Sequence, residues 1–208
     1  MAYTDFTAKD LRLQFGVEMH GKSLFEQVQP VFPSEWLTTA LKMGRKFGLD
    51  TPKSYQERLT SPILAELSTL NHHDFAVHSG ANLDTDEALG LYGECDFLFS
   101  FNRLMDFVLP PVFYVMEAKT MNVEEAAAQL VGAKTMNDTQ GKPMHTIYGC
   151  AAVRNFLNLR LLHNSLVDVF SRFGRVISPH YYVPYLLTFA ILFIFEKIII
   201  VWLMQILR

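Results

Sequence analysis

The spacing of apolar positions predicts helices at the start of the chain. Ser34 is a suitable N-cap, and apolar side chains then recur at helical intervals until Gly48 ends the run. We therefore expect residues 1–53 to form an accessory helical part of the protein.

A second helical stretch is expected over residues 55–70. Pro62 interrupts it, because proline lacks the N–H that a helix interior needs but fits the first turn of a new helix. Ser61 would then cap this new helix. The helix would carry Glu66 among apolar neighbours.

The middle of the chain changes to a β pattern. Segments rich in β-branched and aromatic residues predict strands there, with turn residues between them. The expected strands cover 75–78, 92–101, 112–119 and 146–153. Before the last strand, Asn122 and Glu125 have the spacing of a capping box, and an alanine-rich helix follows over 126–136. This order of elements predicts an α/β fold with a mixed central sheet flanked by helices.

The end of the chain allows more than one reading. Residues 156–162 and 166–170 fit a hairpin that turns at 163–165, although the same pattern also fits a helix. The segment 184–207 is apolar and long enough to span a bilayer, but its central Glu196 and Lys197 would each cost about 3 kcal/mol to insert. We expect an apolar C-terminal helix that is buried or covered by a partner. Left uncovered in the monomer, it would favour a homodimer or a membrane surface.

Length and composition indicate one globular domain. The 208 residues suffice for one large core; half of them are hydrophobic and 19% are charged. The expected parts are the N-terminal helices at 1–53, a core at 54–153, and a sheet edge with the terminal helix at 154–208. The formal net charge of −3 excludes a global field that attracts nucleic acid, so a polyanion would need a local cluster or bound cations.

Cysteine usage and the N-terminal sequence indicate a cytoplasmic protein. Cys95 and Cys150 both lie in apolar, strand-like runs, which favours two buried thiols over a disulfide. Neither a zinc-like cysteine spacing nor a signal peptide is visible in the sequence.

Charged residues interrupt two strands that are otherwise apolar. Asp96 lies in the first of these strands, and Glu117 and Lys119 lie in the second. Side chains alternate between the two faces of a strand, so Glu117 and Lys119 share a face, and a matching register would bring Asp96 to them. A buried carboxylate costs several kcal/mol unless a cation meets it. Two carboxylates suit Mg²⁺, which prefers oxygen ligands and takes few of them from the protein.

Such a site can hydrolyse a phosphodiester. A bound Mg²⁺ lowers the pKa of a water molecule and neutralises charge in the transition state. Lys119 would position that water or stabilise the developing charge, and Gln129 would contact the water or a phosphate oxygen. An internal salt-bridge network and a metal site without turnover remain open as alternatives.

These residues resemble a known family. Asp96, followed about twenty residues later by Glu117-Ala118-Lys119 at the end of an apolar strand, is similar to the motif of the PD-(D/E)xK nuclease superfamily. A group of bacterial members of that superfamily is also similar over shorter segments. These segments are 14–21, 79–84, 93–97 and 147–150, and the resemblance covers residues 8–153.

The resemblance implies a restriction-endonuclease-like fold, with Asp96 and Glu117 as metal ligands and Lys119 as the catalytic lysine. It also implies two further site residues. Glu66 matches an acidic residue on the first core helix that can complete the metal shell, and Gln129 matches the helix position after the motif. Ala133 stands where the RecB-type variant has a tyrosine, so the sequence does not support that variant.

The leading hypothesis is therefore a Mg²⁺-dependent nuclease, with Mn²⁺ as a substitute cofactor, that acts on nucleic acid, DNA before RNA. One alternative is a catalytically inactive module of the same fold that binds metal or DNA. Another is an oligomerising or membrane-peripheral protein organised by the C-terminal helix. We expect no membrane span.

Overall fold

The computed structural model describes residues 2–21, 33–103, 106–117, 123–153, 156–163 and 166–170. The chain divides into two compact units. The first contains the described residues up to 21 and those from 74 onward, and the second contains residues 33–73.

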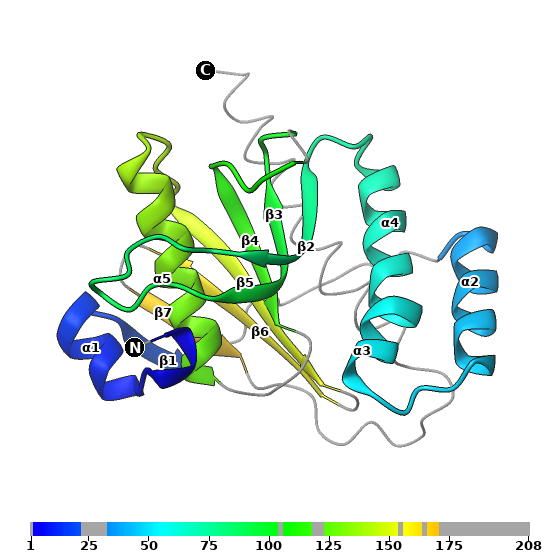
Figure 1. Cartoon of the computed structure of the whole chain (residues 1–208), viewed down its shortest axis with the longest axis horizontal. Helices are drawn as coiled ribbons and strands as arrows, with labels where there is room; N and C mark the ends of the chain where they lie inside the picture. Colours follow the sequence, from blue (N-terminus) through cyan, green and yellow to red (C-terminus); the bar gives the residue numbers. More distant parts are fainter. Residues whose placement is uncertain are drawn as a thin grey trace. The chain divides into compact units, whose positions relative to one another are not determined.

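The first unit is built on one mixed β-sheet (Figure 1). Its strands are β1 (Glu18–Gly21), β2 (Ala76–Asn82), β3 (Glu94–Ser100), β4 (Val112–Glu117), β5 (Thr146–Val153), β6 (Phe156–His163) and β7 (Leu166–Phe170). Among the described strands the spatial order is β1-β7-β6-β5-β4-β3-β2. The pairs β1–β7 and β4–β5 are parallel, and the remaining neighbours are antiparallel.

Helix α5 (Val123–Thr139) connects the parallel strands β4 and β5 and packs against both of them (Figure 1). Its Ala127 and Ala128 are fully buried, so small side chains let the helix approach the sheet closely. The approach is close at Gly149 of β5, where an added Cβ would lie 3.0 Å from a methyl carbon of Leu130. The contact between α5 and the sheet therefore forms the core of this unit, and it fixes the position of the α5 side chains that face β4.

The N-terminus belongs to the same core. A 3₁₀ turn (Tyr3–Asp5) and helix α1 (Ala8–Phe15) both contact α5. The Tyr3 hydroxyl donates a 2.6 Å hydrogen bond to the carbonyl of Leu83, and its ring lies where a Cβ on Gly132 would stand. Deep burial of Tyr3 and Leu11 thus ties the first residues to the sheet unit.

The second unit is helical. Its elements are α2 (Glu35–Lys46), α3 (Pro52–Tyr55), a π-helical turn (Gln56–Thr60) and α4 (Ser61–Leu70). Helix α2 turns Leu37 and Leu41 inward and packs on the π turn and α4. At the end of α2, the Arg58 guanidinium donates hydrogen bonds to the carbonyls of Phe47 and Gly48, which satisfies acceptors that the helix leaves open.

Several predictions from the sequence are confirmed. The fold is a mixed α/β sheet flanked by helices. Ser34 caps α2, since its hydroxyl accepts a hydrogen bond from the Leu37 amide. The strand predicted over 146–153 is β5, and residues 156–163 and 166–170 form the antiparallel pair that the hairpin reading required.

Other predictions were wrong in detail. Ser61 does not cap a new helix; its hydroxyl donates to the carbonyl of Gln56, and the π turn carries the helical path through to Pro62. The start of the chain is not purely helical, because β1 pairs with β7. A four-residue edge strand is too short to show an alternating pattern. Strand β2 also continues to Asn82, into the expected loop.

Some predictions fall outside the described residues. Lys119, Asn122 and the C-terminal helix expected within 184–207 are among them. In the described part of the chain, no helix combines the length and the apolar character that a membrane crossing requires. The single domain with internal boundaries after residues 53 and 153 stays a prediction.

Candidate functional site

Asp96 and Glu117 lie directly opposite each other on neighbouring strands. The antiparallel register of β3 and β4 pairs Phe97 with Met116, so the next position pairs Asp96 with Glu117. Opposed residues project from the same face of a sheet, with Cβ atoms about 4.5–5.5 Å apart. Only 3% of Asp96 and 4% of Glu117 is exposed. The apolar strands thus hold two carboxyl groups together away from water.

This arrangement changes the charge of the pair. Burial, a hydrogen bond to Asp96 and the negative charge of Asp96 raise the pKa of Glu117 to about 8, while a hydrogen bond from Gln129 opposes the rise. Two adjacent buried carboxylates cannot both ionise at low cost, so one proton is shared between them at neutral pH. A bound cation would remove the repulsion and take the place of that proton.

Gln129 reaches the pair from helix α5. Its Nε2 donates a 3.1 Å hydrogen bond to Oε2 of Glu117. The residue is 0% exposed, yet its Oε1 has no hydrogen-bond partner among the described residues. Leaving a buried polar atom unpaired costs about 1–3 kcal/mol. The amide therefore holds the glutamate and offers one further acceptor beside it.

Glu125 is a site residue that the sequence reasoning missed. It precedes Gln129 by four positions on α5, so both side chains project from the same side of the helix. Its negative charge contributes to the raised pKa of Glu117 and of Cys95. The sequence analysis considered Glu125 only for the capping box, although its spacing from Gln129 was a usable signal.

The donor set of Asp96, Glu117 and Gln129 fits a hard divalent cation. All three supply oxygen, and Mg²⁺ commonly takes one or two carboxylates and completes its shell with water or substrate. No group of three or more His, Cys, Asp or Glu side chains in the described residues is arranged to hold a metal ion. A hard cation at this point would have the two carboxylates and the amide oxygen as its protein donors.

Glu66 belongs to the second unit and is held by the N-terminus of α2. Its Oε1 accepts a 2.7 Å hydrogen bond from the amide of Ser34, and its Oε2 accepts one of 2.7 Å from the Ser34 hydroxyl. The side chain is buried in that position. The contacts to Ser34 give Glu66 a structural role, and its role in a metal shell stays a prediction, as does that of Lys119.

Three histidines of the described residues occupy ordinary positions in their own units. His72 and His73 lie in the left-handed region after α4, and the His73 Nδ1 pairs with the Ser68 hydroxyl at 2.8 Å. His78 lies buried on β2, where burial lowers its pKa and favours the neutral imidazole. They form no metal cluster with other described residues.

Comparisons of the chain with protein-family models, with curated proteins and with solved structures found no match.

Proposed function

We propose that this protein is a Mg²⁺-dependent nuclease of the restriction-endonuclease-like fold that hydrolyses phosphodiester bonds in nucleic acid. The buried Asp96–Glu117 pair is the observation that carries the proposal. Two opposed carboxyl groups buried in apolar strands destabilise the sheet, so a purely structural role does not explain them.

The residues around the pair have distinct tasks in this proposal. Asp96 and Glu117 would hold the cation in place of a proton, and Gln129 fixes the orientation of Glu117 through its Oε2. A bound Mg²⁺ would supply an activated water and charge neutralisation. Lys119 follows Glu117 by two positions and would stabilise the charge that develops on the phosphate.

The proposed partners follow from the same chemistry. Mg²⁺ is the cofactor, with Mn²⁺ as a substitute, and DNA is the first substrate to test, with RNA second. The cation would also lower the repulsion that a protein of net charge −3 presents to a polyanion. The proposal places the protein in the cytoplasm.

A cleavage assay tests the activity. Plasmid DNA and labelled single-stranded and double-stranded oligonucleotides of both nucleic acids are incubated with Mg²⁺ and with Mn²⁺. We expect cleavage by the wild type and its loss in Asp96→Asn, Glu117→Gln and Lys119→Ala. Asp138→Asn is the matched control, because Asp138 forms a partly exposed ion pair with Lys134 on α5. Equal cleavage by all variants would assign the activity to a contaminant.

Calorimetry with Mn²⁺ separates the nuclease from an inactive module of the same fold. Binding by the wild type that is lost in Glu117→Gln, together with an absence of cleavage, would favour the inactive module. Unchanged binding in both carboxylate variants would contradict the metal site itself.

A further inference from the structure

Helix α2 carries an apolar face that the described residues leave open. Trp36, Met43 and Phe47 are 55%, 53% and 73% exposed. Together with Ala40 they occupy positions i, i+4, i+7 and i+11, so they form one stripe along the helix and its C-cap residue. We call these four residues the α2 stripe. The C-cap residue is Phe47, and the Arg58 guanidinium lies 6.0 Å from the centre of its ring. The inward face of the same helix is separate, since Leu37 and Leu41 are buried.

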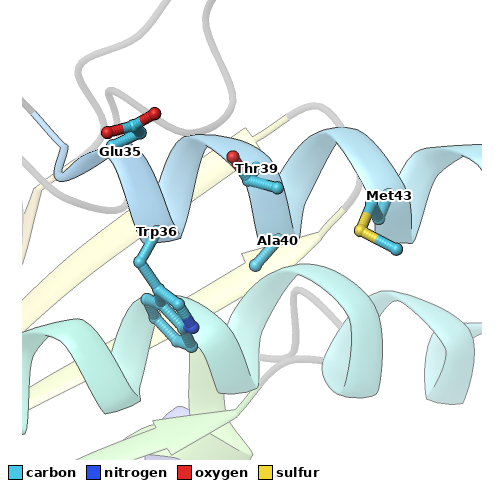
Figure 2. A pocket seen from close by; sticks show the side chains of 5 residues that line it. All are labelled: Glu35, Trp36, Thr39, Ala40 and Met43. Atoms are coloured by element: carbon cyan, nitrogen blue, oxygen red, sulfur yellow. The ribbon is translucent and has the colours of Figure 1, made fainter.

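The stripe borders an open pocket of about 440 Å³ on α2. Figure 2 shows the side chains that line it, which are Glu35, Trp36, Thr39, Ala40 and Met43. Single exposed apolar side chains are common on protein surfaces, but a contiguous group with a tryptophan indicates a binding surface. A helix that is apolar on two faces requires a second covering element.

The sequence supplies one candidate for that element. Between residues 184 and 207 the polar side chains are only Thr188, Glu196, Lys197 and Gln205. Exposing the apolar surface of such a segment to water is unfavourable in free energy. The chain therefore contains an uncovered apolar helix face and an apolar segment that needs cover.

We propose that the C-terminal segment 184–207 docks on the α2 stripe of the same chain. Residues 171–183 join it to β7, so the segment is tethered to the rest of the chain. A tethered segment also has an effective concentration of about a millimolar, which favours it over a second copy at micromolar protein. In this arrangement Glu196 and Lys197 do not have to enter a bilayer, where each would be costly.

Tryptophan fluorescence of the full chain tests the proposal. Trp36 and Trp202 are its two tryptophans, so Trp202→Phe makes Trp36 the sole reporter. We expect acrylamide to quench Trp36 several-fold less than it quenches the single tryptophan of a matched control. The control combines Trp36→Phe and Trp202→Phe with Leu13→Trp, because Leu13 is exposed. Adding Leu192→Asp and Ile199→Asp to the Trp202→Phe chain should raise quenching to the control level, with the circular dichroism spectrum unchanged.

Cross-linking provides a second measurement that does not depend on fluorescence. Met43→Cys is combined in turn with a cysteine at each of residues 198–201, which together span a full helical turn. Cys95 and Cys150 are buried and do not compete. We expect an intramolecular disulfide at one or two of these positions, independent of protein concentration.

Three results would overturn the proposal. One is quenching of Trp36 equal to the Leu13→Trp control. Another is protection, or an intermolecular disulfide, that grows with protein concentration, which would assign the stripe to a second copy. The third is protection that requires vesicles of phosphatidylcholine and phosphatidylglycerol, which would assign it to a lipid surface. None of these results depends on nuclease activity.

Discussion

Two buried carboxyl groups, Glu117 in the sheet unit and Glu66 in the helical unit, are treated differently by their surroundings. Glu66 has each oxygen at 2.7 Å from a donor of Ser34, at the positive end of helix α2. Glu117 faces Asp96 instead, and burial with this neighbour raises its pKa to about 8. The surroundings of Glu66 provide hydrogen-bond donors for both carboxyl oxygens. The surroundings of Glu117 place a second carboxyl group beside it.

The difference shows that burial alone does not identify a functional carboxylate. A glutamate that caps a helix contributes to stability, and its oxygens already have hydrogen-bond donors. A glutamate opposed to an aspartate lowers stability until a proton or a cation intervenes. The partner of the carboxyl group, more than its depth, distinguishes a candidate site from a structural contact.

The largest expected effect follows from Asp96→Asn. Removing one of the two proposed metal ligands should reduce cleavage by more than about 100-fold, since changes even beyond the ligands cost about 10–100-fold in metal sites. The same substitution removes the repulsion from Glu117 and lets an amide donate to it, so the free energy of unfolding should rise. Cleavage rates and urea unfolding at pH 8 are the measurements. A variant that is less stable and still active would place Asp96 among the structural contacts.

The second effect is a pH dependence of stability that Glu117 imposes. Its pKa is raised in the folded protein from the ordinary 4.5 to about 8, so the folded state binds more protons between these values. Stability should fall as pH rises through this window, by at most about 1.4 kcal/mol per pH unit, and level off above it. Urea unfolding from pH 5 to 9 measures the slope.

Glu117→Gln is the control for that slope. The variant should lose the fall in stability and retain the opposite contribution of His78, whose pKa burial lowers. Saturating Mg²⁺ should also reduce the fall in wild-type stability as pH rises, because the cation replaces the proton. An identical slope in wild type and variant would contradict the shared proton.

The sequence predicted the pairing of Asp96 with Glu117 better than it predicted parts of the surrounding fold. Asp96 and Glu117 were detectable because charge is rare in apolar strands, and the two-residue alternation of strands placed them on a common face. Gln129 was placed correctly on the helix after the motif, and its hydrogen bond to Glu117 accounts for its position there.

The parts that were missed depend on distant contacts. The four residues of β1 become a strand only because β7 lies beside them, and no local pattern records that pairing. The path through Pro62 depends on the π turn at 56–60, which a cap-and-proline rule cannot anticipate. The contact between Ser34 and Glu66 joins residues 32 positions apart, so sequence spacing could not separate a helix cap from a metal ligand.

The third effect concerns Gln129→Leu. Leucine keeps the volume and removes both the hydrogen bond to Glu117 and the unpaired Oε1, so stability should change by less than about 1 kcal/mol. Cleavage and Mn²⁺ affinity should fall by about 10–100-fold, because the orientation of a ligand is lost. Gln129→Glu is the companion variant; its added charge should raise the Mn²⁺ affinity above that of Gln129→Leu. Full activity in both variants would remove Gln129 from the site.

The smallest effect is expected from Glu66→Gln in the helical unit. Glutamine has one acceptor where the carboxylate has two, so either the amide or the hydroxyl of Ser34 loses its partner, at a cost of about 1 kcal/mol in the free energy of unfolding. Ser34→Ala attacks the same contact from the other side. If Glu66 serves only the N-terminus of α2, the loss of stability in the double variant should not exceed the summed losses of the two single variants. Cleavage per folded molecule should then be equal in all three variants. A loss of cleavage in Glu66→Gln that Ser34→Ala does not reproduce would instead make Glu66 a ligand, and the two carboxyl groups would then differ in their partners but not in their function.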